Sequence, residues 1–567
     1  MLSTASSVMV AFLVFGVVGL AGARLTQALW RRVPALGFVA GVIVLCVTGW
    51  AQFIVTWLAP PIGPWFSIAV VSGAVVAVVL TRAWRLLRGA WWLLALCAAV
   101  LFCYLGLLLL WRTSGMNLFD IAAWRWHFSA DKPYPVDNYI PTLAADITGA
   151  GTSPQGFIGA WNVGDRPTLE SGLILLGRPL LGGLGLVGVP ASFALSFVVQ
   201  IVWIPALFSA LRVLGVRGSA ARLAIVFAAS TGTMLINTTY TWPKLLSAAL
   251  VVCAAALLIA TIRRLISGPS GLISAALAFA LAMVAHGAAA FALPMIAVLG
   301  VTALVRARGR RILTLVLTAA TAAVCYLPWS LYQRFTSPPG DRLLKWHLAG
   351  IKAPDGNSFL ADVIHQYSST PVEQLIRARL ENLGRVFNPH LLTGLPLDPD
   401  SLSARRHFEY YDTTGALGLS VLILGAMAVT IAVRVLLRRR TMAPTRRLAI
   451  IVLLCVLCML FWSLAMFLSD NAVVHQGSHV WILLLIGAAG AWVASIARWL
   501  GVVAILVQLI LTLAAYVPYF GHTDLSPGGL ALAASGVVVV VGSLVWASVG
   551  ERRPASRASS PRVGSSS

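Results

Sequence analysis

The chain has 567 residues, of which 59% are hydrophobic and only 10% are charged, and its formal net charge is +23. A soluble protein of this length could not bury so much apolar surface, whereas a lipid bilayer solvates it. The positive charge does not indicate a nucleic-acid partner, because the basic residues fall in short clusters between apolar runs, as cytoplasmic loops do. These features predict an all-α, polytopic integral membrane protein.

Apolar runs that are long enough to cross a bilayer recur along the chain, given that one crossing needs about 20 residues. We therefore expect about 15 transmembrane helices. The runs begin near positions 2, 34, 64, 90, 189, 219, 243, 271, 288, 311, 415, 446, 478, 499 and 528.

Basic residues mark one side of the membrane. With an odd number of crossings, about 15, every basic cluster falls on one face, which the positive-inside rule assigns to the cytoplasm. The clusters are Arg24–Arg32, Arg82–Arg88, Arg212–Arg222, Arg263–Arg264, Arg306–Arg311, Arg434–Arg447 and Arg552–Arg562. All acidic residues except Glu551 fall on the other side. We expect a multi-pass protein of the bacterial cytoplasmic (inner) membrane, with the N-terminus outside and the C-terminus in the cytoplasm.

Two long segments between apolar runs predict large extracytoplasmic loops, the first at 112–188 and the second at 333–415. Amphipathic stretches of the first loop, at 118–128 and 169–186, predict helices that lie along the membrane surface. Loops of this length on a helical bundle tend to carry function.

Chemically active side chains gather in the first loop, in the runs 124–141 and 164–172. A carboxylate near the outer membrane surface can take a proton from an acceptor hydroxyl, while a nearby cation holds a phosphate. The candidate catalytic carboxylates are Asp137, Asp165 and, as the runner-up base, Asp120. A structural alternative for Asp137 is an Asx turn with Asn138.

Basic and histidine side chains supply candidate contacts to a substrate. Lys244 opens an apolar run, where its ammonium could meet a lipid phosphate, although interfacial snorkelling explains it equally well. The run 341–347 predicts a surface helix whose cations and indole could line a donor site or anchor the chain at the interface. The candidate phosphate or substrate contacts are Arg166, Lys244, Lys132, His127, Lys345 and His347.

No cofactor is required by the sequence. His475 and His479 are spaced by four in a short outer loop, but a metal site would need a third ligand that the sequence does not assign. The sequence therefore leaves open whether a divalent metal takes part. The chain has no Gly-rich phosphate loop ending in Gly-Lys-Ser/Thr, which argues against ATP hydrolysis.

The layout resembles the GT-C superfamily of membrane glycosyltransferases, which use polyprenyl-phosphate-linked sugars outside the cytoplasmic membrane. Its members share a seven-helix module with a long loop after the first helix and commonly another after the seventh. If the run near position 90 is the first helix, the module spans 90–332 and both large loops fall where the family places them. The resemblance implies a GT-C-like fold with additional helices at 1–89, C-terminal helices at 416–550 and a disordered basic tail at 551–567.

Two short motifs resemble the aminoarabinose and protein-mannosyl transferase branch, which carries Asp-Glu in the first loop and Lys-Pro-Pro-Leu at the start of the next helix. Here Asp137-Asn138 stands for the first motif and residues 166–169 (Arg-Pro-Thr-Leu) for the second. The resemblance implies that Asp137 is the catalytic base and that Arg166 contacts the donor phosphate. It also implies a polyprenyl-phosphate sugar as donor, and an extracytoplasmic glycan, lipid or protein as acceptor, in contact with membrane lipids.

Other functions stay open. A transporter or lipid flippase would need ionisable residues at mid-membrane, whereas the charges here cluster at the ends of the apolar runs. An O-antigen ligase or polymerase would instead have its functional Arg and His residues in the second loop or at His475. A non-catalytic assembly partner is a further alternative.

Overall fold

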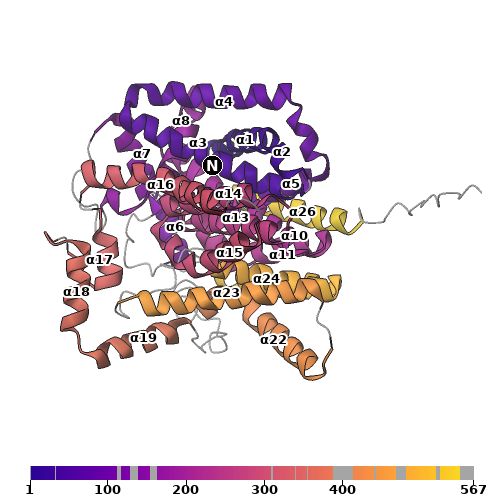
Figure 1. The fold of residues 1–567 in the computed structure, drawn as a ribbon. Coiled ribbons are helices and arrows are strands. Elements are labelled where there is room, and N and C mark those ends of the chain that lie inside the picture. Colours follow the sequence, from indigo (N-terminus) through magenta and orange to yellow (C-terminus); the bar gives the residue numbers. More distant parts are fainter. Residues whose placement is uncertain are drawn as a thin grey trace, which may run out of the picture.

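The structure is a computed structural model. It describes residues 2–31, 33–111, 116–127, 138–152, 162–307, 311–338, 340–353, 355–386, 413–439, 442–467, 480–518 and 524–549. Every regular element among these residues is a helix, apart from an isolated bridge between Trp111 and Leu525. Most of the long helices run side by side in one bundle (Figure 1). The prediction of an all-α protein is confirmed.

Among the described residues, eleven helices are long and apolar enough to cross a membrane, or twelve if one bent pair is a single span. The pair is α11 (Gly218–Ala229) and α12 (Gly232–Thr239), which meet at 67°. Shorter apolar helices are α22 (Ser420–Leu436), α24 (Val480–Ile496) and the stretch Pro527–Val540. Each predicted apolar run begins within a few residues of a helix. The chain is a multi-pass membrane protein, and the count of about 15 spans stays a prediction.

The helices before position 90 form one side of the bundle, at the top of Figure 1. They are α1 (Leu2–Leu25), α2 (Gln27–Trp30), α3 (Leu36–Leu58) and α4 (Gly63–Leu80), with the 3-10 helices η1 (Pro60–Ile62) and η2 (Ala83–Gly89). α3 packs against α8 (Leu169–Gly183) of the first loop. A Cβ at Gly172 would be 2.0 Å from the Gly49 carbonyl oxygen, so this crossing requires glycine.

Helix α13 (Lys244–Ile262) lies at the centre, and every residue from Lys244 to Thr261 is buried. Its first turn is held by polar contacts, with Gln200 Oε1 accepting the backbone N–H of Leu246 at 3.2 Å and the Ser247 hydroxyl donating to the Ala282 carbonyl at 3.0 Å. The helices of this central part also include α5 (Trp91–Leu108), α9 (Gly188–Gln200), α10 (Trp203–Leu214), α14 (Gly268–Ala285), η5 (Gly287–Ala292), α15 (Leu293–Arg306) and α16 (Arg311–Phe335).

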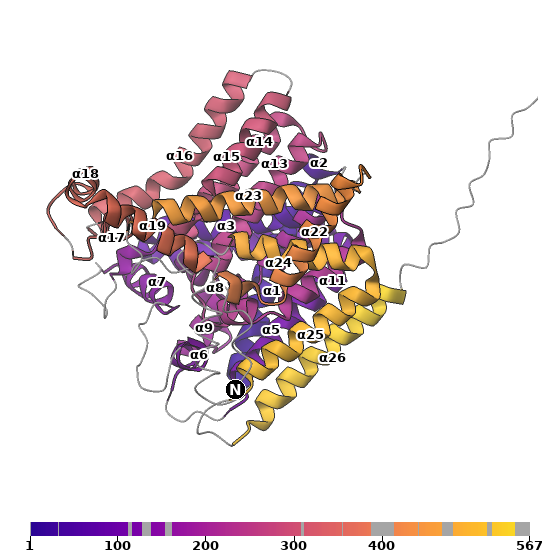
Figure 2. The same cartoon turned by 90° about the horizontal axis from the view of Figure 1, so that it is seen from below.

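Besides α22 and α24, the C-terminal helices are α21 (Thr413–Leu417), α23 (Ala443–Ala465), α25 (Arg498–Tyr516) and α26 (Pro527–Val549). Of the C-terminal helices, α22, α23 and α24 lie on the opposite side of the bundle from α4 in Figure 1. α26 lies along α5, as Figure 2 shows, so that segments far apart in the sequence are neighbours in space.

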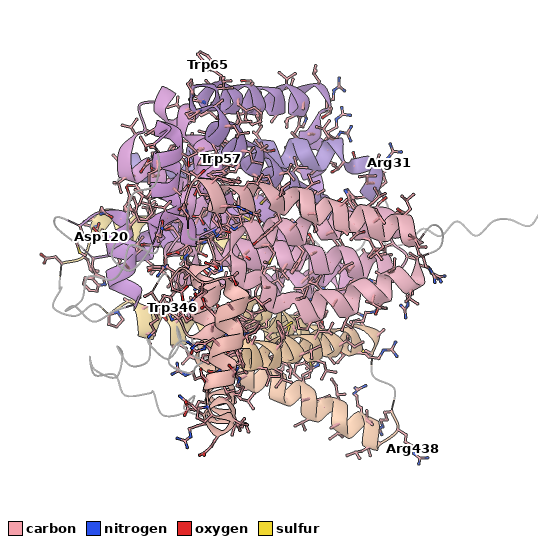
Figure 3. The ribbon with its side chains drawn as sticks, turned by 60° about the vertical axis from the view of Figure 1, so that its left-hand side comes forward. Arg31, Trp57, Trp65, Asp120, Trp346 and Arg438 are labelled. Carbon is pink, nitrogen blue, oxygen red and sulfur yellow. The ribbon has the colours of Figure 1, made fainter. Side chains whose placement is uncertain are left out.

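The two ends of the bundle differ chemically. Arg31 and Arg438 lie at one end, the arginine face, whereas Asp120 and Trp346 lie at the other, the loop face (Figure 3). On the loop face the first loop contributes α6 (Leu118–His127), α7 (Ile140–Ala150), η4 (Val163–Asp165) and α8, and the second loop contributes α17 (Arg342–Ala349), α18 (Phe359–Ser369) and α19 (Val372–Val386).

The two amphipathic stretches predicted in the first loop are helical, as α6 and α8. α8 differs from the expected surface helix, because all residues from Leu169 to Gly177 are buried. The glycines of this stretch permit the difference: Gly172 meets α3, and a Cβ at Gly177 would lie 2.1 Å from a methyl group of Leu195 in α9. α8 is thus a packed element that holds the loop to the bundle.

Candidate active site

The first turn of α13 presents a buried cation at the loop face. Thr241 has a left-handed backbone, with φ at 45°, and Pro243 precedes the helix. Lys244 is only 2% exposed, and its Nζ lies 3.4 Å from the centroid of the Trp242 ring. Cation–π contact holds the ammonium in one place. The N-terminus of a helix carries partial positive charge, so this position favours an anion.

Arg166 and His286 meet beside this turn, although they are 120 positions apart. Both are buried, and Arg166 Nη1 lies 3.4 Å from His286 Nε2. His286 Nδ1 accepts the backbone N–H of Ala288 at 3.1 Å, so we assign the proton of the neutral ring to Nε2. Arg166 and His286 then present neighbouring N–H groups beside this turn, a combination that suits an anionic oxygen.

Asp165 and Arg342 form a buried ion pair between the two loops. Arg342 Nε donates to Asp165 Oδ1 at 3.0 Å, and Nη2 contacts Oδ2. The same Oδ2 also accepts the backbone N–H of Asn162 at 2.7 Å, which closes a capping box around η4. Both oxygens of Asp165 are therefore engaged.

His347 joins these groups from the second loop. Burial, followed by the charges of Arg166, Lys244 and Arg342, lowers the pKa of His347 to about 3. Its backbone carbonyl accepts the N–H of Phe467 at 2.9 Å, which fixes α17 to the end of α23. We call Arg166, Lys244, His286, Arg342 and His347 the cationic cluster.

The structure brings together Arg166, Lys244, His347 and Asp165 from the residues predicted by sequence. It places Lys345 in a different network, where the ammonium contacts Asp355, lies 2.9 Å from Asp362 and lies 3.8 Å from Asp341. Lys345 therefore links α17 to α18 and to the segment between them.

Asp120 lies apart from the cationic cluster, in the first turn of α6. Asn117 caps this helix by accepting the backbone N–H groups of Phe119 and Asp120, and its amide donates to Asp120 Oδ2 at 2.5 Å. The carboxylate is exposed and takes part in a helix cap.

Asp137 and Lys132 lie outside the described residues, as does the side chain of His127. The described chain resumes at Asn138, which is 2% exposed. Its amide donates to the Phe119 carbonyl at 2.9 Å, and its own carbonyl accepts the Thr241 hydroxyl at 3.3 Å. Asn138, the residue after Asp137, is thus hydrogen-bonded to Thr241, which lies three positions before Lys244 in the chain.

Glu170 is a buried acid that sequence reasoning did not select. It is fully buried at the start of α8, and burial raises its pKa well above the usual range. Gln200 Nε2 donates to Glu170 Oε2 at 3.0 Å, while Gln200 Oε1 accepts the backbone N–H of Leu246 at 3.2 Å. This chain of hydrogen bonds ties the first loop to the first turn of α13. The local sequence signal that could have pointed to Glu170 is its position directly after the 166–169 motif.

Two further members of the cationic cluster could be weighed from the sequence but were not among the candidate contacts, since a capping, packing or anchoring role explained each at least as well. His286 ends an apolar run before a glycine, and Arg342 lies beside the two residues chosen from 341–347. Neither position has a local pattern that separates a site residue from a cap or an interfacial anchor. Their roles depend on partners more than 100 positions away.

Within the described residues, no group of three or more His, Cys, Asp and Glu side chains is placed to hold a metal ion. His475 and His479 lie outside that part of the chain. All seven cysteines are free thiols, and each is at least partly buried.

No family model matches this chain, and no curated protein sequence matches it. Solved structures of ArnT from Cupriavidus metallidurans are similar to it. The form bound to undecaprenyl phosphate is 15% identical, with a TM-score of 0.37, and the apo form is 13% identical, with a TM-score of 0.39. Both matches cover 76% of this chain and 75% of ArnT.

An oligosaccharyltransferase from Archaeoglobus fulgidus, also in an apo form, is 14% identical, with a TM-score of 0.36. The match covers 79% of this chain and 56% of that protein. TM-scores in this range describe a partial match of helix packing, so the roles proposed below depend on the residues of this chain.

Proposed function

We propose that this protein is a membrane glycosyltransferase that moves a sugar from a polyprenyl-phosphate donor to an extracytoplasmic hydroxyl on a glycan, lipid or protein. The observation that carries the proposal is the convergence of Arg166, Lys244 and His286 at the loop face. Positively charged and N–H donor groups from three distant segments meet there around the N-terminus of α13. Such a site suits a lipid phosphate.

The cluster stabilises the leaving group in this reaction. The acceptor oxygen forms a bond to the anomeric carbon while the bond from that carbon to the phosphate oxygen breaks. The electron pair leaves with the polyprenyl phosphate, whose growing negative charge is met by Arg166, Lys244 and the Nε2–H of His286. Neutral His347, beside these groups, adds a polar side chain without adding to their mutual repulsion.

Asp137 is the proposed base that takes the proton of the acceptor hydroxyl. It precedes Asn138, whose carbonyl is bonded to Thr241 at the entry to α13. Asp165, with both oxygens engaged, is assigned to holding Arg342, and Asp120 to capping α6. Lys132 and His127 are proposed contacts of the donor or acceptor, and Lys345 is assigned to the fold of the second loop.

The loop face is the proposed extracytoplasmic side of a bacterial cytoplasmic membrane, because Arg31 and Arg438, which belong to two of the predicted cytoplasmic clusters, lie at the opposite face. With this orientation the cluster lies where a lipid-linked sugar presents its head group. The N-terminus is then outside and the C-terminus in the cytoplasm.

The experiment measures transfer of labelled sugar in proteoliposomes that contain the full chain and a panel of polyprenyl-phosphate sugars. Asp137→Asn is expected to lower transfer by about 10²–10⁴-fold, the usual contribution of a general base. Arg166→Gln and Lys244→Met are each expected to lower it by about 100-fold, because each removes a preorganised charge.

Arg178→Gln is the matched control, since Arg178 also lies in the first loop but pairs with Asp146 at 2.7 Å, and transfer should be unchanged. Binding of polyprenyl phosphate alone, by native mass spectrometry, should weaken about tenfold or more in Arg166→Gln and stay unchanged in Asp137→Asn. Undiminished transfer in both cation variants would overturn the assignment. Lipid movement between leaflets without any transfer would favour a flippase instead.

A further inference from the structure

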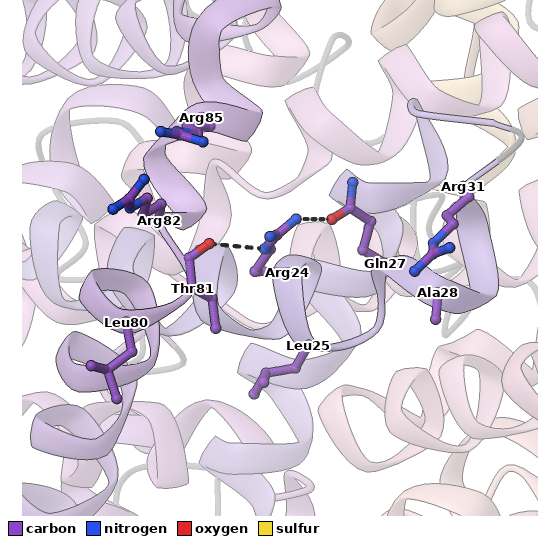
Figure 4. Close-up of a pocket in the computed structure, with 9 residues that line it drawn as sticks. All are labelled: Arg24, Leu25, Gln27, Ala28, Arg31, Leu80, Thr81, Arg82 and Arg85. Carbon is purple, nitrogen blue, oxygen red and sulfur yellow. Dashed lines mark hydrogen bonds between the residues drawn. The ribbon is translucent and has the colours of Figure 1, made fainter.

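The arginine face carries a pocket of about 470 Å³ with four guanidinium groups around it, Arg24, Arg31, Arg82 and Arg85 (Figure 4). It lies where the end of α1 and α2 meet the end of α4 and η2. Arg24 Nε donates to the Thr81 carbonyl at 3.2 Å, and its Nη1 contacts Gln27, which ties two of these segments together. No carboxylate is among the described residues that line this pocket, and the first acidic residue of the sequence is Asp120.

An apolar cavity of about 870 Å³ adjoins this pocket and shares Gln27 and Arg31 with it. Its walls include Phe15 of α1, Phe38 of α3 and Trp92 of α5, so it extends from the surface pocket into the bundle between the N-terminal helices and the central part. Its lining also includes Arg212, Arg222 and Arg263. No acidic side chain is among the described residues that line it.

We propose that the two cavities together form one binding site for an anionic phospholipid of the membrane leaflet at the arginine face. The four-arginine pocket holds the phosphate of the lipid, and the adjoining cavity holds an acyl chain. Guanidinium groups bind phosphate oxygens in a bidentate way, and basic pockets between membrane helices are suited to acidic head groups. An acyl chain fills an apolar cavity that water would not occupy favourably.

The shape of the site favours a phospholipid over a small soluble anion. A free phosphate would use the arginine pocket and leave the larger apolar cavity unfilled. Arg31 lies at the arginine face, whereas Trp346, next to His347 of the cationic cluster, lies at the other end of the molecule (Figure 3). The lipid site is thus separate from the proposed transfer site and does not depend on that function.

The occupant would join two parts of the fold. The apolar cavity is lined by α1 and α3 on one side and by α5, α9 and α10 on the other. A bound lipid therefore contacts both the helices before position 90 and the central bundle. Its removal should loosen the contact between them.

The test uses the full-length protein, delipidated in a neutral detergent, with binding of phosphatidylglycerol and phosphatidylcholine followed by native mass spectrometry. We expect phosphatidylglycerol to bind at one site and phosphatidylcholine to bind weakly. Arg82→Gln with Arg85→Gln should weaken phosphatidylglycerol binding by about 30-fold. Arg438→Gln with Arg439→Gln removes the same charge from the same face at exposed positions away from the pocket, and binding should stay within about twofold.

A second variant tests the acyl cavity without changing charge. Gly16 lines the cavity and a Cβ there would meet nothing within 4 Å, so Gly16→Phe should occupy the space and abolish tight binding. Gly73→Phe is the control, since Gly73 also faces open space but on the outer side of α4. Both substitutions remove a helix glycine, so neither should unfold the chain.

Several outcomes would overturn the proposal. Equal losses in the Arg82/Arg85 and Arg438/Arg439 variants would show general attraction to an acidic surface. Inorganic phosphate that displaces the lipid at equal concentration would show a soluble-anion site. Preference for polyprenyl phosphate over phosphatidylglycerol at this pocket, or full binding in Gly16→Phe, would show that the occupant is not the proposed phospholipid.

Discussion

Asp165 and Arg342 lie 177 positions apart and form a buried ion pair that joins the first loop to the second, with Arg342 Nε 3.0 Å from Asp165 Oδ1. The pair sits directly beside Arg166 in the chain and shares α17 with His347. It therefore holds together the two loop segments that carry Arg166 and His347. Its removal should disturb both the fold of the loops and the proposed site.

Arg342→Met should lower the free energy of unfolding by about 3–5 kcal/mol, because it leaves the Asp165 carboxylate buried without its cation. The double variant Asp165→Asn with Arg342→Met should recover part of that loss. Chemical denaturation in detergent measures both. Arg377→Gln breaks an exposed pair with Glu373 and should change stability little. A loss in Arg377→Gln as large as that in Arg342→Met would contradict the special role of the buried pair.

His347 makes stability depend on pH. Its folded-state pKa of about 3 lies below the unfolded value near 6.5, so the unfolded chain binds the proton more readily. The stabilising contribution is therefore present above pH 6.5 and is lost as the pH falls towards 3. Between pH 7 and pH 5 the loss should be about 2 kcal/mol. Unfolding temperatures across this range should fall less steeply for His347→Gln than for the unmodified protein, and parallel curves would refute the assignment.

Glu170 predicts the opposite dependence. Burial raises the pKa of Glu170, so the folded state keeps a proton that the unfolded state releases above its ordinary pKa near 4.5. Stability from this group is present below that value and is lost as the pH rises through the folded pKa. Glu170→Gln keeps an acceptor for Gln200 without ionising. The advantage of the variant in unfolding temperature should therefore grow from pH 5 to pH 8; a constant difference would show that Glu170 is charged in the folded protein.

The crossing of α3 and α8 should not tolerate an added methyl group. At Gly172 a Cβ would be 2.0 Å from the Gly49 carbonyl oxygen, so Gly172→Ala should separate the helices and cost about 1–3 kcal/mol. Gly182→Ala in the same helix meets nothing within 4 Å and should be neutral or slightly stabilising. Thermal unfolding compares the two, and equal melting temperatures would mean that α8 is free to shift.

Part of the candidate site could be predicted from the amino-acid sequence. Arg166, Lys244 and His347 are candidates on that basis because basic residues and histidine at the ends of apolar runs suit phosphate binding. The pattern could not separate His347 from Lys345, two positions earlier on the same helix. The difference arises in three dimensions, where Lys345 contacts three carboxylates and His347 lies among cations.

The sequence by itself determined the membrane class, the all-α content, the positions where helices begin and the concentration of charge at their ends. These features follow from composition and local chain properties, because each helix satisfies its own backbone hydrogen bonds. Only the tertiary structure decided which helices meet, that α8 is buried, and that Arg166 meets His286 and Asp165 meets Arg342. Helices that are apolar on nearly every side carry no amphipathic pattern to select their neighbours, so close approach at residues such as Gly49 and Gly172 makes that selection.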